Sequence, residues 1–398
     1  AFLQPGNYFE AGISVLDPNV SGKVRNGYTP NAALPASSAG LQNTSVGEMA
    51  GDYYFPSAAL KLQVTDNFSF GLIYDQPFGA EAEYSTGTQK TTALPGPLAP
   101  LGNQGAFHNG TEGTSVEVKS QSISMLFGYQ PTENFNFYAG PVYQTIKGDV
   151  QLRGLAYGGN ATFGGYNASI KETGDIGWLA GAAFQIPDIA LKASVTYRSE
   201  IEHSVNVKES FNSAGLFAGL NAAPSLNTNI TTPQSVNLDF QTGIMANTVA
   251  FANVRWVDWS SFSIQPYKFG LASKNATVQA QTGKSEFDLV AYTDDQISAT
   301  VGVGRKLNDQ WAGNVSVGWD SGAGNPVTTL GPTEGYWNVG LGAQFSPTPQ
   351  TFIAGGVKYF WLGDAKAQSA AQFNTANYVA DFESNYAIAY GLKMGYKF

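Results

Sequence analysis

Acid–base and nucleophilic chemistry in proteins depends mostly on histidine, cysteine and activated serine, and this sequence offers little of it. The 398 residues include two histidines and no cysteine. His108 lies in the Gly- and Asn-rich segment AFHNGTEG, and His203 follows Glu200 and Glu202 near the end of a predicted strand. A hydrolase needs a histidine beside a nucleophile, and no Gly-x-Ser-x-Gly motif is present. We therefore interpret His108 as a solvated loop residue and His203 as a hydrogen-bonded rim residue, and we predict no enzyme activity.

Metal and cofactor chemistry has equally weak support. Glu286, Asp288, Asp294 and Asp295 lie close together in the sequence and could bind a divalent cation. Solvated loop acids account for the same residues without a metal. The absence of cysteine excludes a thiolate metal site, a disulfide and a cysteine nucleophile. We predict neither a metal nor an organic cofactor.

Composition narrows the remaining classes of protein. Charged residues make up 13% of the chain, about half of what is usual in soluble domains, while aromatic residues reach the same 13%. The net charge of −9 and the lack of basic runs exclude a nucleic-acid partner. No run of 18 apolar residues could form a transmembrane helix. The opening AFLQPGNYFEAG lacks the features of a signal peptide, so an exported protein would already have lost its signal.

The end of the chain predicts a membrane-facing strand. From Tyr386 to Phe398, large apolar or aromatic residues alternate without an error with Ala, Gly and Lys. Successive side chains of a strand point to opposite faces, so one face is apolar and the other is small or cationic. This alternation over 13 residues, ending on an aromatic residue, is typical of a strand in an outer membrane barrel.

Similar strands recur along the chain, and their connections alternate between short and long. Further alternating segments cover residues 9–15, 58–64, 68–75, 122–129, 311–319 and 337–345. Short turns near 66–67, 131–134, 187–188, 246–247, 307–310 and 346–350 alternate with long polar stretches near 21–50, 77–113, 149–174, 205–233, 261–294, 321–334 and 365–383. Thirteen connections join fourteen strands.

This pattern predicts an all-β protein, a 14-stranded antiparallel transmembrane β-barrel that forms a single domain over residues 1–398. Its last strand covers about 384–398, its short turns are periplasmic and its long loops are extracellular. A soluble β-sandwich or propeller would carry charged residues on its outer face. Here the alternate face is mostly Gly, Ala, Ser, Asn and Gln, and no blade-length repeat occurs.

Several segments together resemble the FadL family of outer membrane transporters for long-chain fatty acids, which includes channels for aromatic hydrocarbons. The similar segments are LKASVTYRSEIEH (191–203), VRWVDWSSF (254–262), ISATVGVGRKLNDQWAGNVSVGWDSG (297–322) and DFESNYAIAYGLKMGYKF (381–398). The resemblance covers essentially the whole barrel and is clearest over 176–398.

The resemblance implies passive uptake of hydrophobic molecules, such as long-chain fatty acids, across the bacterial outer membrane. In the family, cargo enters an apolar groove between extracellular loops, moves to a pocket in the barrel, and leaves sideways through a gap in the wall. A monomer surrounded by outer membrane lipid and lipopolysaccharide is also implied. Pro141, inside the fifth strand, could mark such a gap or form an ordinary bulge.

The candidate groove lies in the third and fourth long loops. Its apolar residues are Leu155, Tyr157 and Phe163 in the third loop and Phe211, Leu216, Phe217 and Leu220 in the fourth. A short helix would place the four residues of the fourth loop on one side. The same residues would also suit a loop helix that caps the barrel with its own small core.

A fatty acid would need a cation for its carboxylate, because an unpaired charge in an apolar pocket is costly. Arg153 stands where the family has an arginine near the pocket, and Arg198 is the second candidate. Pairing with the adjacent Glu200 inside the wall is an alternative role for Arg198. Residues 293–295 read Thr-Asp-Asp where the family places a lysine, which favours a neutral or aromatic substrate as an alternative.

Two further interpretations remain open at this stage. Family members carry a plug of about forty residues before the first strand, whereas this chain enters its first strand by about Asn7, so the plug is missing from the chain or short. A porin-like channel for small polar solutes is the main alternative function, although inward charges such as Lys61, Lys393 and Lys397 form no arginine ladder. An adhesin or a structural barrel is a more distant alternative function.

Overall fold

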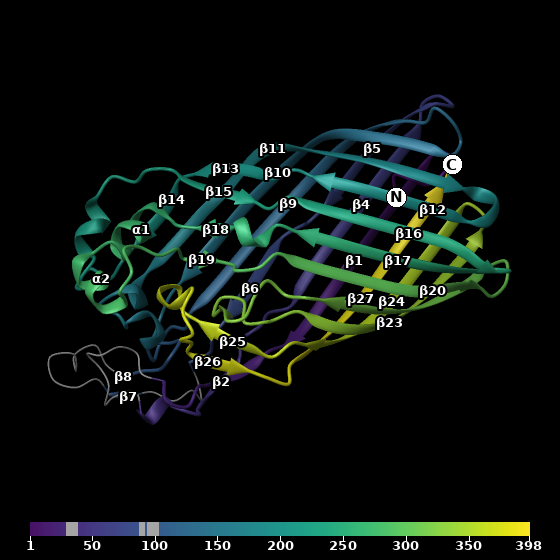
Figure 1. Ribbon diagram of the computed structural model, residues 1–398. Helices are drawn as coiled ribbons and strands as arrows, with labels where there is room; N and C mark the ends of the chain where they lie inside the picture. The colour runs from purple at the N-terminus through teal and green to yellow at the C-terminus, as the bar shows by residue number, and fades with distance from the viewer. Residues whose placement is uncertain (29–38, 87–91, 94–102) are drawn as a thin grey trace.

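The computed structural model describes residues 1–28, 39–86, 92–93 and 103–398, and it shows a closed barrel of fourteen antiparallel strands (Figure 1). The wall strands are β1 Tyr8–Asn19, β4 Tyr53–Gln63, β5 Phe68–Asp75, β9 Ser115–Tyr129, β10 Phe135–Gln151, β11 Asn167–Ile186, β12 Leu191–Arg198, β16 Ser235–Met245, β17 Thr248–Val257, β20 Gln296–Lys306, β21 Trp311–Asp320, β23 Tyr336–Thr348, β24 Thr351–Leu362 and β27 Tyr386–Lys397. The first and last strands pair from Tyr8↔Lys397 to Asn19↔Tyr386, so the sheet closes on itself. The predicted fold class is confirmed.

The two faces of the wall explain why these sequences form strands in a membrane. On β27 the large residues Tyr390, Leu392 and Met394 are between 50% and 55% exposed, whereas Ala387 on the other face is buried. A soluble sheet would cover such residues, but a barrel presents them to lipid. Aromatic pairs mark the two rims of this band, for example Trp311 with Phe345 and Trp319 with Trp337.

Tight turns close the end of the barrel that carries both chain termini (Figure 1). Between β16 and β17 the pair Met245↔Thr248 is joined by Ala246 and Asn247. Asn247 has φ +58°, a conformation that asparagine tolerates better than most residues. The short connections predicted from Asn, Asp and Pro therefore lie together at one end.

At the opposite end the long connections fold into a structured cap (Figure 1). We use the word cap for the following elements and the described residues between them: β2 Ser21–Val24, β3 Ser45–Glu48, β6 Gly79–Glu83, β7 Thr92–Ala93, β8 Asn103–Gln104, β13 Ile201–Val205, β14 Val207–Ser210, β15 Thr228–Thr232, β18 Ser263–Ile264, α1 Tyr267–Ser273, α2 Ala276–Thr282, β19 Val290–Ala291, β22 Val327–Thr328, β25 Ala365–Gln368 and β26 Ala380–Phe382. Strands β22, β25, β26, β2 and β3 form one small sheet. None of the helices in the described ranges is long and apolar enough to cross a membrane.

The predicted short helix around 211–220 is wrong in its extent. Only a 3-10 helix, Ala218–Ala222, forms there. Glycine at 215 and 219 disfavours a longer helix, and the Leu216 backbone N–H donates instead to the Ala161 carbonyl of the neighbouring loop at 2.8 Å. The segment is therefore held by tertiary contacts.

Candidate functional site

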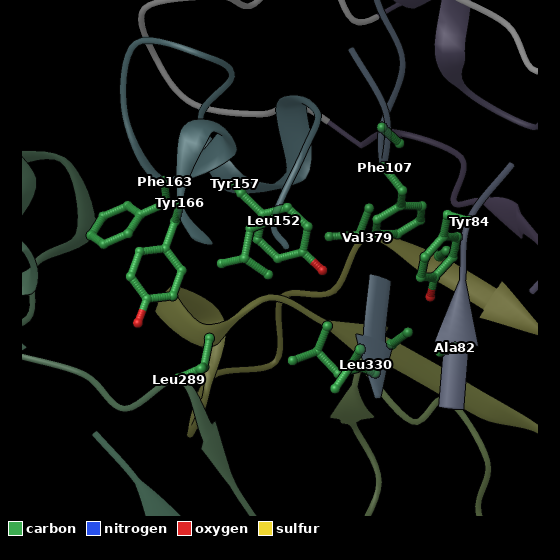
Figure 2. Close-up of a cluster of buried hydrophobic side chains, with 14 of the residues drawn as sticks. Ala82, Tyr84, Phe107, Leu152, Tyr157, Phe163, Tyr166, Leu289, Leu330 and Val379 are labelled. Atoms are coloured by element: carbon green, nitrogen blue, oxygen red, sulfur yellow. The ribbon is translucent and has the colours of Figure 1, made fainter. Parts of the chain in front are cut away.

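Aromatic side chains from several loops pack on one another in the centre of the cap. The ring centroid of Phe163 lies 4.9 Å from that of Phe217, 5.0 Å from that of Phe269 and 5.4 Å from that of Phe287. Phe211 joins the same cluster, 5.1 Å from Phe217. Figure 2 shows Phe163 and Tyr166 in this core together with Tyr157 and Leu152. The cap thus has an apolar core of its own.

A pocket of about 300 Å³ lies beside this core, and we call it the cap pocket. Tyr157, Phe163, Phe269 and Phe287 contribute to its wall, and the segment 369–377 provides another side. Burial raises the pKa of the Tyr157 hydroxyl above its usual range, so this hydroxyl is neutral at all physiological pH values. The pocket combines these aromatic side chains with uncharged polar ones such as Thr162, Gln281 and Gln372, and Arg25 also lines it.

The sequence-predicted groove residues occupy different positions around this pocket. Tyr157 and Phe163 line it. Leu155, Phe211 and Phe217 are buried in the core, and Leu220 packs against that core. Leu216 is 46% exposed and belongs to neither group.

Residues of the fifth long loop were missed by sequence reasoning. Phe269 on α1, Val278 on α2 and Phe287 line the cap pocket together with residues of the third loop. The signal was present, because residues 267–282 (YKFGLASKNATVQAQT) read as two short helices separated by an Asn. The resemblance directed attention to the third and fourth loops instead.

Arg153 is committed to contacts within the cap. Its Nε donates to Glu112 Oε2 at 2.6 Å, and its Nη2 donates to Asn167 Oδ1 at 2.9 Å. Its Nη1 donates to the carbonyls of Leu152 at 2.8 Å and Tyr166 at 3.1 Å. Four of its five N–H groups are used in tying the ends of β10 and β11 to a neighbouring loop.

Arg198 lies in the barrel interior and faces Asp75, not the adjacent Glu200. Its Nη2 is 3.9 Å from Asp75 Oδ2, a residue of β5 that is distant in sequence. Both residues line an interior pocket of about 130 Å³, which we call the lumen pocket. The alternative of a local pair with Glu200 is wrong, because β12 ends at Arg198 and the ion pair that Arg198 makes is with Asp75.

The wall has a break beside β5. Strand β4 pairs with β5 only as far as Ala58↔Tyr74, although β4 continues to Tyr53. The chain then passes through Gln76, Pro77 and Phe78 before β6 pairs with β9. Within the described residues, Tyr53–Ser57 have no ladder partner on this side. Pro77 has no N–H, and the Phe78 ring turns to Trp259, with centroids 5.6 Å apart.

A second interruption, between β11 and β12, is filled by side chains. The ladder stops at Leu179↔Arg198 and resumes at Ile170↔Val207 on β14. The Ile201 side chain lies directly against Gly177: a Cβ added to Gly177 would be 2.5 Å from Ile201 Cγ1. His203 is fully buried, 3.1 Å from Asp175 Oδ2 and 3.0 Å from Gln144 Oε1. These contacts seal the interruption.

Pro141 marks no opening. The β9–β10 ladder lacks the pairs between Ala139↔Phe127 and Val142↔Ser124 but keeps the same register on both sides, and Pro141 still pairs with Trp178 on β11. A Cβ at Gly140 would lie 1.6 Å from the Met125 carbonyl, so the two strands are in close contact. Pro141 therefore interrupts the β9–β10 ladder locally, without a bulge and without an opening.

Residues 1–7 lie inside the barrel near the short turns. Phe2 is buried between the inner faces of β5 and β9, where Gly71 and Gly128 leave room for its ring. Lys61 Nζ donates to the Gln4 carbonyl at 2.7 Å, and Lys192 Nζ donates to the Leu3 carbonyl at 3.3 Å. This segment narrows the lumen at that end.

Comparisons with known proteins agree with this architecture. The family described as "Outer membrane protein transport protein (OMPP1/FadL/TodX)" matches residues 102–398. A search among curated protein sequences gives no match. Three similar solved structures are a Pseudomonas aeruginosa FadL homologue, the Pseudomonas putida toluene transporter TodX and the Ralstonia pickettii toluene transporter TbuX. Their identities to this chain are 15%, 13% and 11%, and their TM-scores are 0.69, 0.62 and 0.55. The alignments cover 99%, 100% and 100% of this chain and 91%, 91% and 90% of theirs.

Proposed function

Because the chain belongs to the OMPP1/FadL/TodX family of outer membrane transport proteins, we propose that it takes up compact hydrophobic molecules through its cap and releases them sideways into the membrane. The protein is an outer membrane β-barrel, and its family is one of transporters, not of enzymes. The observation that carries the proposal is the cap pocket, with Tyr157, Phe163, Phe269 and Phe287 in its wall, on the side opposite the short turns.

Capture in the cap pocket is driven by the removal of apolar surface from water. This burial contributes about 25 cal/mol per Å². A volume of about 300 Å³ is at the small end of ligand pockets, which favours a single aromatic ring or a medium-length alkyl chain. Tyr157 and Phe163 contact the cargo, while Leu155, Phe211, Phe217 and Leu220 support them from behind. Toluene transport by two of the similar proteins and the FadL likeness of the third agree with such cargo.

Exit takes place at the break between β4 and β5. The ladder hydrogen bonds between β4 and β5 are missing at this break. The break lies beside the lumen pocket, because Asp75, Pro77 and Phe78 line that pocket. A hydrophobic molecule that leaves here enters lipid directly and avoids a return to water. Lipid and lipopolysaccharide are then the immediate surroundings of a protein that acts as a monomer.

Filling the cap pocket tests the proposal. Ala371 lines the pocket on a 3-10 helix, and Ala222 is an exposed alanine on another 3-10 helix. Saturable quenching of tryptophan fluorescence by toluene or octanoate in detergent is expected for the unchanged protein and for Ala222→Trp, after correction for the added indole. Ala371→Trp should weaken the binding of toluene and of octanoate at least tenfold. Equal binding to all three proteins, or saturable binding of a sugar only, would contradict the proposal.

A further inference from the structure

We propose that the outward face of β9, β10 and β11 binds the phosphate groups of lipid A, the phosphorylated lipid anchor of lipopolysaccharide, through a row of lysines. The three strands lie side by side in the wall (Figure 1). Lys119 on β9, Lys147 on β10 and Lys171 on β11 form the set that we call the lysine row. The inference rests on the proposed function only for the orientation of the barrel, with the cap outside the cell.

The lysine row brings like charges together. Lys119 and Lys147 are direct cross-strand partners. The β10–β11 register then shifts, which leaves both Lys171 and Glu172 opposite Lys147. All three lysines are exposed. Side chains directly opposite each other in a sheet have Cβ atoms about 5 Å apart, and like charges there are destabilising. A bound anion would offset this repulsion.

Two carboxylates on the same face already have partners. Glu117 forms an ion pair with Lys119 at 2.8 Å. Glu172 Oε1 accepts hydrogen bonds from Thr145 Oγ1 at 2.9 Å and from Gln121 Nε2 at 3.3 Å. Glu172 is thus held by its neighbours on β9 and β10, and it forms no ion pair with a lysine among the described residues.

Cations remain in excess toward β11 and β14. The strands β9, β10, β11 and β14 together expose four lysines and three carboxylates. Lys147, Lys171 and Lys208 have no ion pair within the described ranges. Glu81 and Glu83 lie on β6, which pairs with the other edge of β9. The free positive charge is therefore on the side of the patch that is distant from these two acids.

The lysine row lies near the depth of lipid head groups. Four residues separate Lys119 from Ile123 and Lys147 from Tyr143, the exposed apolar residues nearest to the row on each strand. Four residues span about 13 Å along a strand, and the tilt of barrel strands makes the height smaller. Lysine stems can lie along an apolar surface while the ammonium group stays in the polar layer. A lipid whose acyl chains contact Ile123 and Tyr143 therefore has its phosphates within reach of the row.

The positive charge is confined to one sector of the barrel. In the described part of the chain, no other wall strand carries an outward lysine or arginine in the half nearer the cap. On β1 the outward residue there is Asp17, opposite Ile388 of β27. A single cluster of lysines fits one bound lipid better than a general attraction to an anionic membrane. Phosphate groups accept strong charge-assisted hydrogen bonds from lysine, and lipid A presents them in the leaflet that faces the cap.

Native mass spectrometry of the complete barrel in detergent tests the inference, with EDTA present so that no divalent cation joins lipid and protein. The probes are diphosphoryl lipid A, the same lipid A without its phosphates, and phosphatidylglycerol. The unchanged protein should bind diphosphoryl lipid A at least tenfold more tightly than the other two. Lys147→Gln combined with Lys171→Gln should weaken this binding at least tenfold, since hydrogen bonds to charged groups contribute about that factor each. Lys23→Gln combined with Lys366→Gln makes the same change of charge on exposed lysines of the cap and should leave the binding unchanged.

Folding of each variant is checked by its heat-dependent mobility in gel electrophoresis. Equal losses in the two double variants, or no loss in the folded Lys147→Gln, Lys171→Gln protein, would overturn the site. Equally tight binding of lipid A without phosphates would overturn the role of the phosphates, and equally tight binding of phosphatidylglycerol would overturn the assignment to lipid A. None of these outcomes depends on cargo, whose binding the fluorescence experiment measures, so a failure of this inference is distinguishable from a failure of the proposed function.

Discussion

Replacing Arg153 with methionine is expected to loosen the third extracellular loop while the barrel wall stays intact. Methionine keeps most of the length of the side chain but has no N–H donors. The change removes the donor that now bonds the Leu152 carbonyl and Asn167 Oδ1, and it leaves the Tyr166 carbonyl with only the Leu152 N–H. It also removes an ion pair with Glu112, whose side chain is 51% exposed, so that solvent already screens this contact.

The lost hydrogen bonds to the carbonyls of the buried residues Leu152 and Tyr166 therefore dominate the cost. Leaving a buried acceptor without its donor costs about 1–3 kcal/mol, and with the other lost hydrogen bonds the total is about 3 kcal/mol, which corresponds to roughly a hundredfold change in an equilibrium constant. Backbone amides of 152–167 should then exchange with deuterium about a hundred times faster in Arg153→Met, without any ligand present. Amides of β27 should not change.

Two matched variants separate the contributions. Glu112→Gln should accelerate exchange only a few-fold, because the exposed ion pair contributes about 1 kcal/mol or less. Lys147→Met, a change of an exposed cation on β10, should have no effect. Unchanged exchange of 152–167 in Arg153→Met would refute the structural role and return this arginine to the list of substrate-binding candidates.

Two other predictions concern the wall and the pH dependence of a loop. Because the chain has no cysteine, a bifunctional maleimide can join Pro56→Cys to Gln76→Cys across the break, and this should reduce uptake of hydrophobic cargo severalfold; the same reaction at the paired positions Ala58→Cys and Tyr74→Cys should not. Equal effects of both cross-links would place the exit elsewhere. Burial raises the pKa of Glu334 to about 7 from an ordinary value of 4.5, so the folded loop holds a proton that the unfolded loop releases. The contribution of protonated Glu334 to the stability of the folded loop is therefore complete below pH 4.5 and is lost as the pH rises through about 7. Hydrogen exchange of the backbone amides of 321–335, corrected for intrinsic rates, should become faster over this pH range in the unchanged protein and not in Glu334→Gln.

The barrel could be predicted because its information is local. A two-residue alternation such as that of Tyr386–Phe398 needs only the pleat of a strand and a lipid exterior. The turn at Ala246 and Asn247 is likewise encoded by the residues that form it. Counting such strands and turns was enough to obtain the fold.

The cap could not be predicted in the same way, because its contacts join distant loops. Phe163 meets Phe269 and Phe287, which lie more than one hundred residues further along the chain. Arg153 was identified as a candidate ligand for a carboxylate, but its partner Glu112 lies on another loop whose approach no periodicity reveals. Arg198 was similarly assigned a neighbour in sequence, whereas barrel closure brings Asp75 to it.

Uptake by intact cells tests the central claim most directly. A Gram-negative strain without its own transporters for hydrophobic compounds would express this chain, Ala371→Trp or Ala222→Trp at equal levels in the outer membrane. Hydrophobic uptake predicts rapid entry of labelled octanoate or toluene with the unchanged chain and with Ala222→Trp, much slower entry with Ala371→Trp, and no added entry of a labelled sugar. Faster sugar entry without any gain for the hydrophobic compounds would contradict it and establish an open polar channel.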